Sequence, residues 1–224
     1  MLIDLLSGNF DRWTLISLLL SLPCVILALT VHECAHGYAA YKLGDPTARN
    51  FGRLTLNPLK HLDLFGTLCM LIAGFGWAKP VPINVRYFKN YKRDMAITAA
   101  AGPLSNLLMG AVASALSALF VRFIVPLIPY SETANNLVLV IILFLQTFAL
   151  LNFSLCFFNL IPLPPFDGSR ILFLFLPDRY YFGIMKYERY IMIGLLVLLW
   201  TDIIDLPISD IAYTLNSLII NLIA

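Results

Sequence analysis

The sequence predicts an all-α polytopic integral membrane protein that forms a single membrane-embedded domain over residues 1–224. First, 60% of the 224 residues are apolar and only 12% are charged, whereas soluble proteins contain roughly 45–50% apolar and about 25% charged residues. Mean hydropathy is accordingly high, at +0.83. Second, the apolar residues gather in long runs. A soluble fold has too little interior for this surface, so the lipid bilayer has to cover it.

About five transmembrane helices are expected, within a range of four to six. They cover residues 13–43, 95–125, 137–160, 187–204 and 208–223, and the last is the weakest. Gly44 and Pro46 should end the first helix, because together they disfavour another helical turn. The prolines between 161 and 166 similarly forbid a continuous helix after the third span.

A shorter apolar run, residues 64–76, has only thirteen residues, whereas a spanning helix needs about 20. We therefore expect a re-entrant loop or a β-hairpin that enters the bilayer part way. Residues 78–85 follow it and should be extended, because each proline there biases its predecessor toward β or polyproline geometry.

The net charge of +2 is too small to indicate a nucleic-acid partner. The positions of the basic residues are more informative. Nine of the 15 Lys and Arg residues fall between Lys42 and Arg93, and basic loops stay in the cytoplasm. We expect a multi-pass protein of the cell membrane whose first helix ends on the cytoplasmic side.

His32, Glu33 and His36 form an H-E-x-x-H pattern near that end. Residues four apart lie on one helix face, so both imidazoles can reach one metal ion. Zinc accepts imidazole and carboxylate ligands, and a catalytic zinc has three protein ligands. Glu33 flanks the same face as a base for a water molecule. Ionisable residues are costly inside a membrane and are usually functional, which favours a metal site over chance.

The third ligand has to come from elsewhere at the same depth. Asp167 lies just past the cytoplasmic end of the third span, so it can meet the histidines. His61 is the alternative, although a lone histidine in a polar loop is more often solvated.

These motifs resemble the site-2 protease family of intramembrane zinc metalloproteases. His32–His36 matches its H-E-x-x-H, and Asn159–Gly168 looks like its N-x-x-P-x-P-x-x-D-G, whose aspartate is the third zinc ligand. The resemblance covers roughly residues 25–175 and the family's minimal core, without a PDZ domain. It implies one zinc ion per chain, held by His32, His36 and Asp167, with Glu33 catalytic.

The resemblance also implies roles for residues with competing interpretations. Asn159 is either a substrate or oxyanion ligand or the C-cap of its helix. Asn106 belongs to a stripe of small residues at every fourth position of the second span, which favours close packing, but it also matches a family motif and could support the zinc site. The 74–85 segment, which includes Gly74, Phe75 and Gly76, either receives the substrate as an added strand or only plugs the site.

The expected function is cleavage of peptide bonds in or near transmembrane segments, that is, regulated intramembrane proteolysis. The implied substrates are single-span membrane proteins or remnant signal peptides. Two alternatives remain open: a non-catalytic relative that binds membrane helices, and a metal transporter. A transporter would need further ionisable residues along its helices, and the apolar runs contain few.

Overall fold

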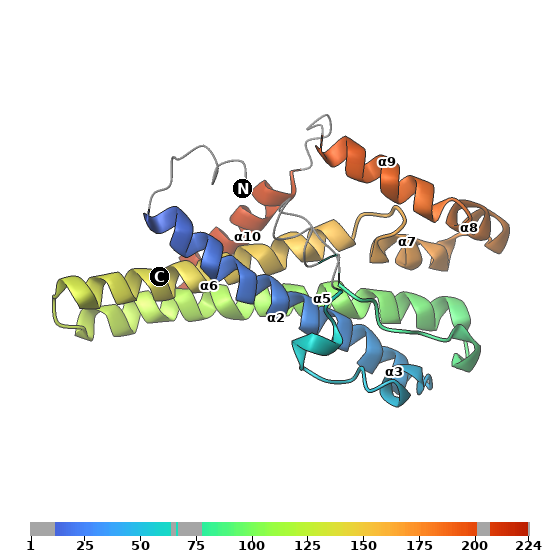
Figure 1. Ribbon diagram of the computed structural model, residues 1–224, viewed down its shortest axis with the longest axis horizontal. Coiled ribbons are helices and arrows are strands. Elements are labelled where there is room, and N and C mark those ends of the chain that lie inside the picture. The colour runs from blue at the N-terminus through green and yellow to red at the C-terminus, as the bar shows by residue number, and fades with distance from the viewer. Residues whose placement is uncertain (1–11, 64–65, 67–77, 201–206, 224) are drawn as a thin grey trace.

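The computed structural model of the protein describes residues 12–63, 66, 78–200 and 207–223 (Figure 1). Its helices are α2 (Arg12–Lys42), α3 (Thr47–Asn50), α5 (Tyr91–Leu119), α6 (Glu132–Asn159), α7 (Asp167–Leu172), α8 (Asp178–Met185), α9 (Glu188–Trp200) and α10 (Ile208–Ile223). Short 3-10 or π turns cover Pro58–Lys60, Val85–Tyr87, Phe120–Ile124, Val125–Leu127 and Phe173–Phe175. The described residues contain no strand, only an isolated antiparallel bridge between Leu62 and Ala78. The all-α prediction is confirmed.

Three helices in the described part are long and apolar enough to cross a membrane. They are Leu15–Lys42, Tyr91–Leu127 and Glu132–Asn159. Helix α10 is apolar but has 16 residues, and α9 has 13. Residues 201–206, where the fourth predicted span ends, lie outside the described residues. The chain is a membrane protein, and the number of about five spans stays a prediction.

Two helices begin earlier than the apolar runs predict. Helix α5 begins at Tyr91 because the Asn90 side chain accepts a hydrogen bond from the Arg93 amide. Helix α6 begins at Glu132, where Ser131 caps the Ala134 amide in the same way. A capping side chain satisfies the first free amides, so a polar first turn precedes each apolar run.

The long helices α5 and α6 lie side by side and form the centre of the bundle, against which α2 and α10 pack (Figure 1). The predicted small-residue stripe of α5 is buried, and its members face α2, α6 and α10 at different positions. At Gly110, a Cβ atom would lie 2.7 Å from the ring of Phe153 on α6. Phe153 belongs to the apolar core together with Ala113, Ala149 and Ala212. The glycine therefore allows the two helices to approach closely.

A polar network, formed by Ser114, Ser117, Gln146 and Asn216, ties α10 to this pair. The Ser114 hydroxyl donates to Asn216 Oδ1 at 2.7 Å. Asn216 Nδ2 donates to Gln146 Oε1 at 2.6 Å, and Gln146 Nε2 donates to the Ser117 hydroxyl at 2.8 Å. Hydrogen bonds between neutral side chains are typical links between membrane helices.

The predicted re-entrant loop or hairpin, with Gly74, Phe75 and Gly76, lies outside the described residues apart from Gly66. Its two flanks are described. Leu62 and Ala78 form the antiparallel bridge, and the Lys79 amide donates to the His61 carbonyl at 2.8 Å. The two residues that flank this segment, Leu62 and Ala78, therefore lie next to each other.

Candidate metal centre

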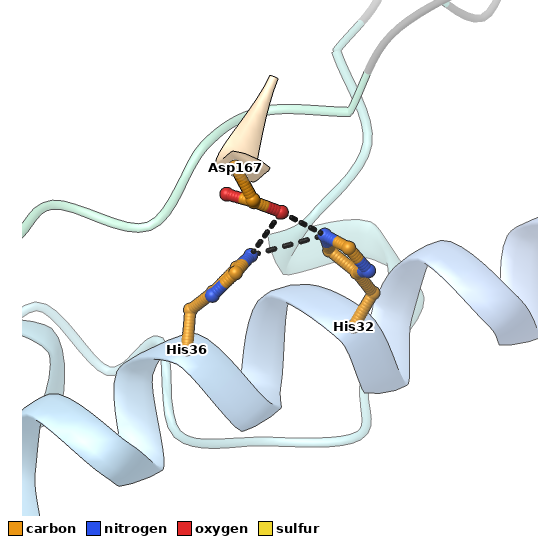
Figure 2. Close-up of side chains that lie close together, drawn as sticks. All are labelled: His32, His36 and Asp167. Carbon is orange, nitrogen blue, oxygen red and sulfur yellow. Dashed lines mark hydrogen bonds and ion pairs between the residues drawn. The ribbon is translucent and has the colours of Figure 1, made fainter. Parts of the chain in front are cut away.

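The structure brings His32, His36 and Asp167 together. The two histidines lie on successive turns of α2, and the Asp167 carboxylate approaches them from the first turn of α7 (Figure 2). Asp167 Oδ2 lies 3.2 Å from Nε2 of each histidine, and the two Nε2 atoms are 3.0 Å apart. Both histidines are buried. Three potential ligand atoms therefore converge, although His36 and Asp167 are 131 positions apart in the sequence.

This arrangement fits a zinc ion. A tetrahedral zinc site with bonds of about 2.1 Å holds its donor atoms about 3.4 Å apart, close to the separations here. Two imidazole nitrogens and one carboxylate oxygen are a usual donor set for catalytic zinc, which leaves one position open. Burial favours the neutral form of Asp167, but its contacts with the His32 and His36 rings outweigh burial and hold the pKa of Asp167 well below its usual range. An ionised carboxylate is the form that binds a metal.

A tight turn places Asp167 at the centre. Helix α6 ends at Asn159, and the proline-containing turn leads directly into α7. At Gly168, a Cβ atom would lie 2.3 Å from the Leu160 carbonyl oxygen. Only a residue without a side chain lets the chain fold back so closely, so Gly168 is required by packing next to the ligand.

Nδ1, the ring nitrogen of each histidine that points away from the three ligand atoms, also has a contact partner. His36 Nδ1 lies 2.7 Å from the Thr98 carbonyl oxygen, and because a carbonyl only accepts, Nδ1 has to be the donor. His32 Nδ1 lies 3.3 Å from Asn106 Oδ1. These contacts orient both rings with Nε2 toward the centre, as the outer partners of metal-bound histidines do. Asn106 is thus placed to support His32, which is one of the two interpretations that the sequence left open. Thr98 was missed because its contact is made by the backbone, which has no sequence signal.

Helix α5 supports the histidines through Gly102 as well. A Cβ atom on this glycine would lie 2.4 Å from His36 Nε2 and 2.6 Å from His32 Nε2. The α5 backbone therefore lies directly against the face of α2 that carries the imidazoles.

A small cavity opens beside the centre. Its volume is about 150 Å³, and it is lined by the three predicted ligands, by Glu33 and by Pro80, Val81 and Ile83 of the segment after the bridge. Glu33 Oε2 accepts a hydrogen bond from the Val81 amide at 2.8 Å. Arg170 also lines the cavity. The predicted base, the ligands and the backbone of this segment thus share one space.

The remaining predicted residues differ in their placement. Asn159 lines the cavity, but its Nδ2 donates to the Leu155 carbonyl within α6 at 2.9 Å, and the helix C-cap is Leu160. Its substrate role stays a prediction. Gly74, Phe75 and Gly76 are not described. His61 was expected to be solvated, and this was wrong: it is buried, with Nε2 2.8 Å from the Thr55 carbonyl, and it is not part of the cluster.

Comparison with known proteins agrees with this geometry. The family described as "Peptidase family M50" matches residues 21–200. The chain is 41% identical over 179 residues to "Putative zinc metalloprotease YwhC" of Bacillus subtilis, covering 80% of this chain and 79% of that protein. It is 30% identical over 103 residues to "Putative zinc metalloprotease Rip2" of Mycolicibacterium smegmatis, covering 42% and 38% of the two chains. No solved structure matches the chain.

Fold, site and relatives together define a membrane zinc metalloprotease, with zinc as its metal. The chain belongs to peptidase family M50, the site-2 protease family.

Proposed function

We propose that this peptidase cuts peptide bonds in or near the transmembrane segments of single-span membrane proteins or remnant signal peptides, from the cytoplasmic side of the cell membrane. The observation that carries the proposal is the position of the centre. His32 and His36 lie within the apolar span Leu15–Lys42, near its C-terminal end, and the loop that follows is basic. A water-soluble protein does not enter the membrane to this depth and therefore would not reach the site.

Each residue of the centre has a role in hydrolysis. His32, His36 and Asp167 would hold zinc, which when bound polarises the scissile carbonyl and lowers the pKa of water. Glu33 accepts the proton of the attacking water as the new C–O bond forms. It then passes the proton to the amide nitrogen as the C–N bond breaks, so that a carboxylic acid and an amine are released.

The segment 79–84 supports the binding of an unwound substrate. A transmembrane helix satisfies its own backbone groups, so unwinding it in lipid requires replacement hydrogen bonds. Ile83 lines the cavity, and its amide has no hydrogen-bond partner among the described residues. An extended substrate can pair with such a free backbone amide and add to the segment as a strand.

Reconstitution with a single-span substrate tests the proposal. Wild type should cleave it, and Glu33→Gln should retain zinc but cleave about 10²–10⁴-fold more slowly, because the amide cannot take the proton. Glu132→Gln, an exposed acid at the start of α6, is the matched control and should cleave normally. Equal rates for Glu33→Gln and wild type would show that the base is wrong. Zinc-loaded wild type without any cleavage would favour the non-catalytic relative.

A further inference from the structure

Buried side chains of the loop after α2 hold both ends of the segment 79–84. At one end, Arg53 Nη2 donates to the Lys79 carbonyl, and the His61 carbonyl accepts the Lys79 amide at 2.8 Å. At the other end, the fully buried Asp45 accepts the Asn84 amide at 2.7 Å. Asp45 is fixed in turn by the Thr47 amide at 2.9 Å. The segment is therefore anchored through its backbone, independently of its side chains.

Between these anchors, one backbone group faces the predicted base. The Val81 amide donates to Glu33 Oε2 at 2.8 Å. Pro80 and Pro82 flank Val81, and proline fixes its own φ and restricts the residue before it. The direction of the Val81 N–H thus depends on how this stiff segment is anchored.

Arg53 is the unusual anchor. It is only 7% exposed, no carboxylate pairs with it among the described residues, and its Nε has no hydrogen-bond partner there. Burying a guanidinium is costly unless it makes charge-assisted hydrogen bonds. Its hydrogen bond to the Lys79 carbonyl, two residues before Val81, is the contact through which this cost is offset.

We propose that Arg53 is a positioning residue for Glu33: it fixes Lys79, and thereby directs the Val81 amide to the Glu33 carboxylate. This inference rests on the proposed proteolytic function. Arg53 does not contact the metal ligands and does not line the cavity beside them, so its loss should alter the rate of the chemical step rather than zinc binding.

Cleavage kinetics of matched arginine variants test the inference. Arg53→Met should lower kcat by about 10–100-fold, since misplacing a catalytic group by about 1 Å can cost up to about 10²-fold. Zinc content should stay within about 10% of wild type, and KM should rise as well, because the same segment is proposed to bind the substrate. Arg53→Lys should recover part of kcat, because its ammonium group can donate to the same carbonyl. Arg49→Met is the control: Arg49 lies in α3, in the same connection after α2, but contacts Tyr41, and it should behave as wild type.

Amide hydrogen exchange gives a reading that needs no activity. Within residues 79–84, only Lys79, Val81, Ile83 and Asn84 carry amide hydrogens, since the other two are prolines. Exchange in this segment should be faster in Arg53→Met and unchanged in Arg49→Met.

Three results would overturn the inference. They are a wild-type kcat in Arg53→Met, a loss of kcat that only parallels a loss of zinc and is not recovered by Arg53→Lys, and unaltered exchange in the 79–84 segment. If wild type itself cleaves nothing, the proposed function fails, and hydrogen exchange alone then decides whether Arg53 holds the segment.

Discussion

The bundle buries polar side chains in two regions that are organised in opposite ways. In the polar network of Ser114, Ser117, Gln146 and Asn216, each link pairs a neutral donor with a neutral acceptor on a neighbouring helix. In the metal centre, three ligand atoms point at one another and at a cavity. The hydrogen bonds of the network need no further partner, whereas the ligand atoms of the metal centre need a cation. Buried polarity in this membrane protein thus serves helix packing in one region and chemistry in the other.

Removing one ligand should have the largest effect. His36→Ala leaves a nitrogen and an oxygen, too few to hold zinc, so zinc binding and cleavage should both fall below detection. Metal analysis of the purified protein measures this directly. His61→Gln is the matched control, because glutamine can still donate to the Thr55 carbonyl, and it should retain one zinc per chain. Loss of zinc in His61→Gln would make His61 a ligand after all.

The next-largest effects should come from the same substitution at two glycines of α5, which should impair zinc binding at one and stability at the other. In Gly102→Ala, the new methyl group would overlap both imidazoles, so zinc affinity should fall by more than about 100-fold, beyond the effect of losing an outer partner. In Gly110→Ala, the methyl group would press on Phe153, which should destabilise the fold by about 1–3 kcal/mol. Zinc titration and thermal unfolding of both variants check this. Equal zinc affinities would contradict the assigned packing.

Asn106→Leu should have an intermediate effect. It removes the acceptor of His32 Nδ1 but leaves all three ligands, and loss of an outer partner typically costs about 10–100-fold in metal affinity. Competition with a chelator gives the affinity. If the affinity is unchanged, Asn106 serves only the packing stripe.

Asn216→Leu should have the smallest effect. It breaks the polar network at its centre, and interhelical hydrogen bonds in membranes contribute about 0.6 kcal/mol on average and up to about 1.7 kcal/mol. Thermal unfolding should show a loss of this order, with zinc affinity unchanged. A fall in zinc affinity would show that the two regions are coupled.

Sequence reasoning found the parts of the centre that periodicity controls. Spacing on a helix places His32 and His36 on one face, so their convergence follows from local geometry. Topology could place the third ligand only at a certain depth in the membrane. The family motif then identified it as Asp167. The Thr98 carbonyl and the Val81 amide were out of reach, because a backbone contact depends on how distant segments fold together.

The errors have similar causes. Helix starts at 95 and 137 were placed late because hydropathy marks where lipid begins, whereas Asn90 and Ser131 begin the helices one turn earlier. His61 was expected in solvent because its neighbours are polar, but the Pro58–Lys60 turn before it packs against α2, and Leu62 after it bridges to Ala78. Neither effect is encoded by composition alone.

The two prolines beside Val81 bear on autolysis. A hydrolase that keeps a piece of its own backbone next to its base risks digesting itself. Here the Val81–Pro82 bond has a tertiary nitrogen and a stiff backbone, and the Val81 amide is already committed to Glu33. The segment can therefore line the cavity without being hydrolysed, while a flexible substrate chain that binds beside it is cut.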